Sequence, residues 1–460
     1  MGSKKNAWLK FDDTKKEEIF SFCEGYKKYI SDCKTERESI KEAIYLAESK
    51  GYRDLKNVIS AGKSLKAGDK VYYNNMDKSL ALFLIGSESI ESGMRIIGSH
   101  VDSPRLDLKP NPLYEDSELS LMETHYYGGV KKYQWVTIPL ALHGVVVKKD
   151  GTKIDVVVGE EETDPVVMVS DLLVHLASEQ QQKKATEVIA GEDLNILVGS
   201  MPLEGEEKEA VKANILKLLK EKYDFEEEDF MSAEIEIVPA GKARDLGLDR
   251  SMVAGYGHDD RICAYTSLLA LLETESTKKT SVVLLVDKEE VGSIGATGMQ
   301  SRFFENAVAE LMDRVGEYSE LKLRRALANS KMLSSDVTAA FDPNYAGAYE
   351  KKNSAFFGKG LAFAKYTGAR GKSGCNDANA EFVAWLRNVM DENYVAYQMA
   401  ELGKVDQGGG GTIAYILAEY GMEVIDCGVA LQNMHAPWEV ASKVDIFETM
   451  RGYKAFLMAE

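Results

Sequence analysis

The chain has 460 residues, enough for one to three domains and a large buried core. Its hydrophobic content of 45% and charged content of 28% are those of an ordinary globular protein. The formal net charge of -18 argues against a nucleic-acid partner, because binding to nucleic acid needs a basic face.

The N-terminal part of the chain predicts helix followed by one short strand. Residues 15–50 are rich in Glu, Lys, Ala and Ile, a composition typical of helix. The apolar run at 94–98 predicts a buried strand, and the polar segment GSHVDSPRLDLKP begins at its end.

The sequence pattern changes at residues 110–237, where strand-like runs predict a β-rich insertion. Two strand-like runs in VTIPLALHGVVVKKDGTKIDVVVG flank the turn residues 149–152, which indicates a β-hairpin. One amphipathic helix is expected near 209–222, and residues 231–238 alternate like a half-buried strand.

After Pro239 the sequence alternates between strand-like and helix-like segments. SVVLLV precedes a helix near 302–314, LAFAKY precedes ANAEFVAWLRNVM, and EVIDCGVAL precedes a final helix near 444–456. This rhythm predicts an α/β fold in which helices cover both faces of a sheet. We expect residues 1–109 and 238–460 to form one discontinuous α/β domain, interrupted by the insertion at 110–237.

The cysteines and the apolar runs bear on the cellular location. Five cysteines are scattered along the chain without Cys-x-x-Cys spacing, which is typical of a reducing compartment. No apolar run approaches the roughly 20 residues of a membrane span, and the start MGSKKNAWLK lacks the apolar core of a signal peptide. We therefore expect a cytoplasmic protein without a membrane partner.

Polar side chains that suit catalysis follow several predicted strands. Glu289 and Glu290 in VDKEEVGS follow SVVLLV after only two residues, although two adjacent carboxylates repel each other and are costly to desolvate. Polar residues just past strand ends are where an open α/β sheet builds its sites. The other candidates are His100 and Asp102 in GSHVDSP, Asp259 in YGHDDRICAY, Asp336 in LSSDV and His435 in LQNMHAPWE.

Each of these signals is weak when taken alone. The spacing His-x-Asp also occurs in surface loops, and Asp259 or Asp260 fits a simple helix N-cap. Together, however, the residues form a set rich in oxygen donors with few nitrogens. Such a set suits two divalent ions about 3.5–4 Å apart, as in hydrolytic two-metal sites.

The Glu pair fits this chemistry, because one carboxylate binds a metal while the other takes a proton from the attacking water. No GxSxG nucleophile motif and no GxxxxGK phosphate loop competes with this interpretation.

Several motifs, in order, resemble the aspartyl aminopeptidase and vacuolar aminopeptidase I family of dinuclear zinc exopeptidases. They are GSHVDSPRLDLKP, YYGG, HDDR, DKEEVGS, SSD with DPNY shortly after it, and NMH-x-x-x-E, and they span residues 98–439. The resemblance implies a metallo-aminopeptidase that removes N-terminal residues from peptides with a free N-terminus. It implies a zinc-exopeptidase-like mixed sheet flanked by helices, with an inserted β-rich dimerisation domain.

The resemblance also implies cofactors and partners. Two divalent metal ions per subunit are expected, most simply Zn²⁺, although Co²⁺ and Mn²⁺ also suit this donor set. Dimers of the chain are expected to assemble into a tetrahedral dodecamer.

The resemblance also implies a role for each of several residues. Asp102 orients His100, and Glu289 is the general base. The implied zinc ligands are His100, Asp259 and Asp336 at one ion, and Asp259, Glu290 and His435 at the other, with Asp259 bridging both.

Substrate contacts are implied less directly. His175 in SDLLVHLASEQ is expected to reach the neighbouring subunit's site and bind the substrate carbonyl, in preference to being a third metal ligand. Lys365 and the glycines Gly409 and Gly410 of QGGGGT are the expected substrate-binding residues. Arg370 and Lys372 join Lys365 as candidates for recognising an acidic side chain, and a neutral or hydrophobic preference, as in the aminopeptidase I branch, is equally compatible with the sequence.

The sequence departs from the family at Ala339 and Asp342, in the GGGG of the glycine-rich loop and in the loosely matched segment GKSGCNDANAEF, which leaves the side-chain specificity open. Two other functions also remain open. Ala339 and Asp342 stand where the family commonly has histidines, which leaves the expected metal ligands intact. The alternatives are an N-acyl amino acid deacylase or carboxypeptidase on the same scaffold, and a non-catalytic shell-forming protein.

Overall fold

The computed structural model describes residues 5–460, which divide into two compact units. The first unit comprises the described part of Met1–Asp102 together with Ala243–Met434 and Glu439–Glu460. The second comprises Ser103–Lys242 and the short segment His435–Trp438. The expected insertion at 110–237 lies within this second unit, whose limits fall a few residues outside it.

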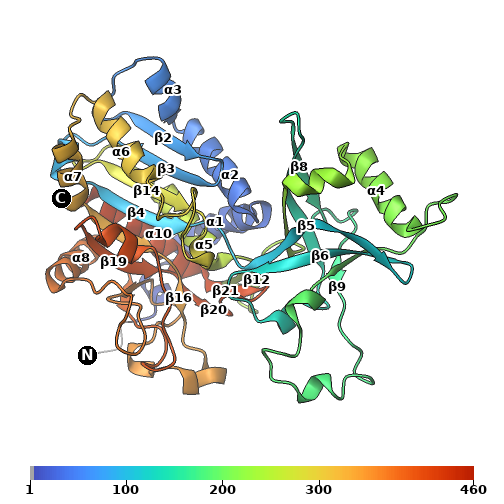
Figure 1. Cartoon of the computed structure of the whole chain (residues 1–460). Helices are drawn as coiled ribbons and strands as arrows, with labels where there is room; N and C mark the ends of the chain where they lie inside the picture. Colours follow the sequence, from blue (N-terminus) through green and yellow to red (C-terminus); the bar gives the residue numbers. More distant parts are fainter. Residues whose placement is uncertain (1–4) are drawn as a thin grey trace. The chain divides into compact units, whose positions relative to one another are not determined.

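A mixed nine-stranded sheet forms the centre of the first unit (Figure 1). Its four middle strands, β14, β4, β15 and β19, run parallel, and antiparallel pairs flank them on both sides. In spatial order the strands are β1 (Arg53–Asp54), β2 (Lys70–Asn75), β3 (Ser79–Leu84), β14 (Ser281–Val286), β4 (Arg95–His100), β15 (Lys331–Ser335), β19 (Glu423–Gly428), β17 (Leu361–Ala364) and β18 (Tyr397–Met399).

Successive residues of the central strands enter two different apolar cores, because side chains alternate between the faces of a strand. Ile97 packs in one core and its neighbour Ile96 in the other. Leu333 and Met332 of β15 divide in the same way. Both faces of the sheet are therefore buried, which explains why these strands read as continuous apolar runs.

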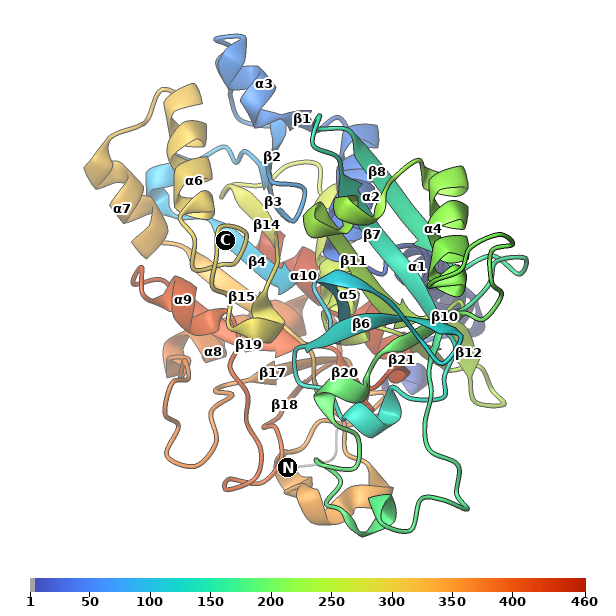
Figure 2. The same cartoon turned by 45° about the vertical axis from the view of Figure 1, so that its right-hand side comes forward.

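Helices cover the two faces, as Figure 1 and Figure 2 show. One face packs against α1 (Asp13–Asp32), α2 (Glu36–Ser49), α5 (His258–Leu272), α8 (Ala380–Glu392) and α10 (Lys443–Met458). The other packs against α3 (Leu55–Ser60), α6 (Phe303–Arg314), α7 (Glu320–Ala328) and α9 (Ala414–Ala418). The predicted α/β fold with a mixed sheet flanked by helices is confirmed.

A smaller five-stranded sheet also belongs to the first unit. It includes the antiparallel hairpin of β12 and β13. Its strands are β12 (Arg244–Leu246), β13 (Met252–Gly255), β21 (Glu439–Ser442), β20 (Ala430–Gln432) and β16 (Thr338–Ala339).

The second unit is built on a seven-stranded antiparallel sheet and one longer helix, α4 (Ala210–Tyr223). The predicted hairpin is the pair β7 and β8, whose turn places Gly151 at φ +87°. In spatial order the strands are β8 (Lys153–Val158), β7 (Leu140–Val147), β11 (Ala233–Pro239), β5 (Arg105–Asp116), β6 (Leu119–Tyr127), β10 (Ile196–Gly199) and β9 (Met168–Val169).

The helix-like stretch at 15–50 consists of two helices, because a strong start signal interrupts it. Thr35 accepts a hydrogen bond from the Glu38 backbone N–H at 3.2 Å, and Glu38 accepts one from the Thr35 N–H at 3.0 Å. This reciprocal capping box begins α2 and separates it from α1.

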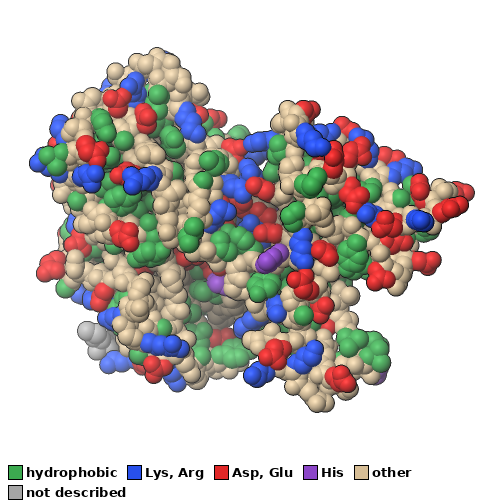
Figure 3. All heavy atoms as spheres, viewed as in Figure 1, with side chains coloured by type: hydrophobic (Ala, Val, Ile, Leu, Met, Phe, Trp, Pro, Cys, Tyr) green, Lys and Arg blue, Asp and Glu red, His purple; other side chains and the backbone are tan. Residues whose placement is uncertain are grey.

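The surface charges and the lengths of the helices bear on possible partners. Figure 3 shows acidic and basic side chains interspersed over the face that it draws. Among residues 5–460, no helix is both long and apolar enough to cross a membrane.

We expect Thr35→Ala to lower the free energy of unfolding by about 1 kcal/mol, because it removes the hydroxyl that accepts from the Glu38 N–H at the start of α2. Thr35→Ser retains the hydroxyl and should keep most of that stability. Thermal unfolding of the two variants side by side measures the difference. Equal losses for Ser and Ala would contradict a role for the hydroxyl.

Candidate metal centre

The parallel strands bring three polar strand ends to one edge of the large sheet. Val286 pairs with His100 across β14 and β4, and Ser334 pairs with Gly98 across β15 and β4. The carboxyl ends of parallel strands meet at the same edge, so residues following β14 and β15 lie beside His100. Those residues are Glu289, Glu290 and Asp336.

The start of α5 adds two further carboxylates. Asp259 and Asp260 have non-helical backbone angles, and the peptide bond between them is cis. The Asp259 N–H donates to Glu439 at 3.0 Å, while the His100 N–H donates to Asp260 Oδ2 at 3.4 Å. These contacts hold Asp259 against β21 and Asp260 against β4.

His100 lies at the centre of the group and is only 1% exposed. Its Nε2 is 3.2 Å from Asp259 Oδ1 and 3.8 Å from both Asp336 Oδ1 and Glu289 Oε2. One imidazole nitrogen therefore faces three carboxylates that arrive from three separate elements.

Asp102 holds two parts of this arrangement in place. The backbone N–H groups of Glu289 and Glu290 donate to its two carboxylate oxygens, each at 3.2 Å. His100 Nδ1 lies 2.9 Å from the Asp102 carbonyl oxygen and 3.4 Å from its carboxylate. Donation from Nδ1 leaves the lone pair on Nε2, the nitrogen that faces the carboxylates.

The close carboxylates raise one another's pKa values. Burial raises the pKa of Glu289 to about 8, and the charges of Asp336, Asp102 and Asp259 add to this. Burial also raises the pKa of Asp260 well above its ordinary value, with a further contribution from Asp336. Several anions in so small a buried space are electrostatically unstable without a cation.

Burial and charge act in opposite directions on His100. Burial alone lowers its pKa, but the carboxylates of Asp102, Asp259 and Asp336 raise it well above the ordinary value. A positive charge is therefore favoured at this point of the site.

The donor set fits divalent metal ions. Two groups have ligand atoms that all lie within 4.8 Å of one another: His100, Asp260 and Asp336, and His100, Asp259 and Glu290. Among residues 5–460, His100 Nε2 and Asp260 Oδ1 are buried and make no hydrogen bond. Nitrogen and carboxylate donors with buried atoms lacking partners suit zinc and similar ions.

Asp260 was not among the predicted metal-site residues, since the sequence indicated only that it fits a helix cap. It is fully buried, with one oxygen toward the His100 backbone and the other without a hydrogen-bond partner among the described residues. The sequence signal was the pair of adjacent aspartates in HDDR, of which only Asp259 was predicted as a metal ligand.

The remaining predicted histidines lie in the second unit. His435 Nδ1 is 2.9 Å from the Gly129 carbonyl oxygen, so donation there leaves the lone pair on Nε2. His175 is exposed on the segment between β9 and η4 (Gln180–Gln182). The roles of both residues stay predictions.

The predicted substrate residues gather around one loop. Lys365 Nζ pairs with Asp377 at 2.7 Å, and Lys372 shares that carboxylate at 3.1 Å. The Gly410 N–H donates to the Thr367 carbonyl at 3.3 Å. β17 runs antiparallel to β19, and its last pair joins Ala364 with Asp426. The chain at Lys365 therefore runs away from the carboxyl end of β19.

His258 precedes the two aspartates and serves packing. It is fully buried, its ring stacks on Tyr26 with centroids 5.6 Å apart, and its Nδ1 shares a short hydrogen bond with the Tyr26 hydroxyl. Burial and the charge of Arg261 lower its pKa to about 3.

Comparison with known proteins identifies the family of this chain. A probable M18 family aminopeptidase 1 of Clostridium acetobutylicum is 66% identical over 454 residues, which is 98% of each chain. The crystal structure of an M18 aminopeptidase from Thermotoga maritima has a TM-score of 0.94 at 45% identity and covers 99% of both chains.

A more distant structure, the S. cerevisiae mApe1 dodecamer, has a TM-score of 0.77 at 21% identity and covers 95% of this chain and 96% of that one; this likeness shows the fold alone. The model of the family described as aminopeptidase I zinc metalloprotease (M18) matches residues 29–457. The chain belongs to this family of zinc metallopeptidases.

Proposed function

We propose that the chain carries out the aminopeptidase reaction of its family at the His100 cluster. Family membership confirms the predicted zinc-dependent aminopeptidase and disfavours the deacylase and the non-catalytic shell. The observation that carries the proposed location is the approach of three carboxylates to His100 Nε2 within 3.8 Å.

We propose two ions per subunit, with zinc as the native metal. In this proposal His100, Asp259 and Asp336 hold one ion, and Asp259 and Glu290 contribute to the other. His435 remains the predicted nitrogen ligand, and Asp260 is an additional oxygen donor beside the first ion. Bound ions of this kind polarise a peptide carbonyl and make water a better nucleophile at neutral pH.

The chain's own residues then move the proton. Glu289, with Oε2 3.8 Å from His100 Nε2, accepts the proton of the attacking water and returns it to the leaving amine. The Asp102 carboxylate accepts a hydrogen bond from the Glu289 N–H and so holds the Glu289 backbone in position beside His100. The two adjacent glutamates therefore have different roles: Glu289 transfers protons and Glu290 binds metal.

Glu289→Gln should retain metal but lower kcat by about 10²–10⁴-fold, because general acid–base catalysis contributes that much. Initial rates on peptides with a free N-terminus and metal content per subunit give the two readouts. Glu88→Gln, at an exposed glutamate paired with Lys279 at 2.8 Å, is the matched control. A Glu289→Gln enzyme within tenfold of wild type would remove Glu289 from the mechanism.

We also propose that His175 acts in the site of a second copy. It lies in a run of exposed apolar side chains, which include Val174 at 68% and Leu176 at 66% exposure. Contiguous exposed apolar residues mark interaction surfaces. The run fits a dimer contact of the second unit, and dimers arranged as a tetrahedral dodecamer complete the proposed assembly.

A mixture of His175→Ala and Glu289→Gln subunits should regain activity that neither variant has alone. In such hybrids one subunit supplies the intact His175 and the other the intact Glu289. His125→Ala, which changes an exposed histidine of the same unit, should stay fully active and serves as the control. Verified hybrids without any regained activity would place His175 within its own subunit.

We propose a cytoplasmic location for this enzyme. All five cysteines are unpaired, and four of them are buried. Reduced cysteines of this kind are typical of a reducing compartment.

A further inference from the structure

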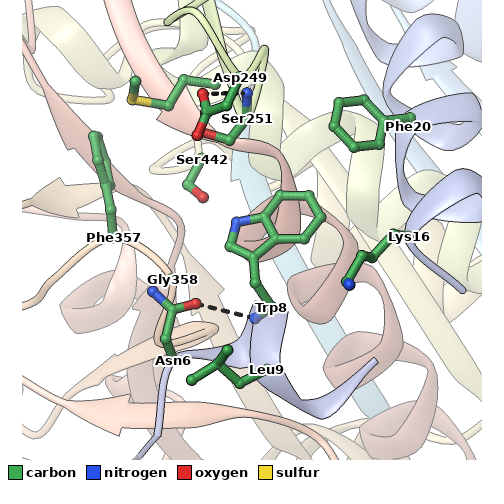
Figure 4. A pocket seen from close by; sticks show the side chains of 11 residues that line it. Asn6, Trp8, Leu9, Lys16, Phe20, Asp249, Ser251, Phe357, Gly358 and Ser442 are labelled. Atoms are coloured by element: carbon green, nitrogen blue, oxygen red, sulfur yellow. Dashed lines mark hydrogen bonds between the residues drawn. The ribbon is translucent and has the colours of Figure 1, made fainter. Parts of the chain in front are cut away.

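A pocket of about 620 Å³ lies in the first unit, and no step of the proposed reaction uses it. Figure 4 shows its aromatic lining, with Trp8, Phe20 and Phe357 around the space. The Trp8 and Phe20 rings lie 5.7 Å apart, and Leu9 at the edge is 77% exposed. An apolar hollow of this size, open to the surface, suits an apolar side chain from a partner.

The hairpin of β12 and β13 carries an apolar side chain directly beside this pocket. Leu248 at its tip is 108% exposed, which is complete exposure. The next residues along the hairpin, Asp249, Ser251 and Met252, line the pocket. The chain thus presents an apolar knob and an apolar hollow on neighbouring parts of one surface.

The turn holds Leu248 outward. The Arg250 N–H donates to the Gly247 carbonyl at 3.0 Å, and Gly247 has a φ of +86°. Asp249 Oδ1 accepts hydrogen bonds from the Ser251 N–H at 3.1 Å and from the Ser251 hydroxyl at 3.0 Å. A tip tied in this way inserts into a partner with little loss of conformational freedom.

The tip and the pocket each carry one acidic and one basic side chain, and Asp249 belongs to both. Asp249 and Arg250 follow Leu248 at the tip, and Lys16 and Asp249 lie at the pocket. If Leu248 of one copy enters the pocket of another, the acidic group of the tip faces Lys16. The basic group of the tip then faces the other copy's Asp249. Opposite charges at the rim of an interface favour this pairing over a random one.

We propose that this pocket receives the Leu248 tip of a second copy of the chain. This inference rests on the assembly proposed above and names one of its contacts, on the catalytic unit. Because each copy carries both halves, the contact closes around a twofold axis or in a ring. It is separate from the contact proposed for the His175 segment, which lies on the other unit.

Leu248→Glu should break this contact without disturbing the fold, since the side chain touches nothing within its own subunit's core. We expect the mass of the largest species in analytical ultracentrifugation to fall roughly twofold or more, because one class of interface is lost. Leu321→Glu, at a 55% exposed leucine of α7, is the matched control and should leave the mass unchanged. An unchanged mass for Leu248→Glu would overturn the proposal.

Cross-linking tests the same contact directly, in a Cys375→Ser background that removes the one cysteine that is not buried. Leu248→Cys and Leu9→Cys proteins, mixed and oxidised, should yield a disulfide-linked pair of both variants. No mixed pair, in protein that does assemble, would overturn the proposal. Cleavage of free N-terminal residues by the wild type, measured separately, shows whether the aminopeptidase function stands whatever the result.

Discussion

Burying several carboxylates around one histidine is the constraint on which the rest of this structure depends. His100 and Asp260 are almost wholly buried, and Asp336 and Glu289 face the same imidazole nitrogen. Burial is the main cause that raises the pKa of Glu289 to about 8, because a negative charge is unfavourable in a buried position. Divalent cations relieve that repulsion, so the features that disfavour these anions alone make them good ligands.

The fold supplies the geometry that such a site requires. Four parallel strands at the centre of the sheet end at one edge, and alternating side chains anchor each strand in two separate cores. Strands anchored in this way keep the polar residues at their ends in fixed positions. Asp102 then joins two of these ends, since it accepts from the backbone of the Glu pair and lies beside His100. Rigid support of this kind is what a preorganised site needs.

The sequence predicted much of this arrangement because strand ends are local features. SVVLLV followed by two glutamates, and a histidine after an apolar run, are both visible without a structure. Asp260 was missed because a doubled acid before a helix fits a cap equally well, and only burial separates the two interpretations. The Leu248 tip and its pocket involve segments far apart in the chain, from Asn6 to Ser442, which no local pattern connects.

The most direct test of this account is to locate the metal. Crystals of the enzyme grown with zinc and measured at the zinc absorption edge give anomalous peaks at the ions themselves. The account predicts two peaks per subunit, both beside His100 and the carboxylates of Asp259, Glu290 and Asp336. A single peak, or peaks away from His100, would contradict the two-metal centre that the buried carboxylates are proposed to hold.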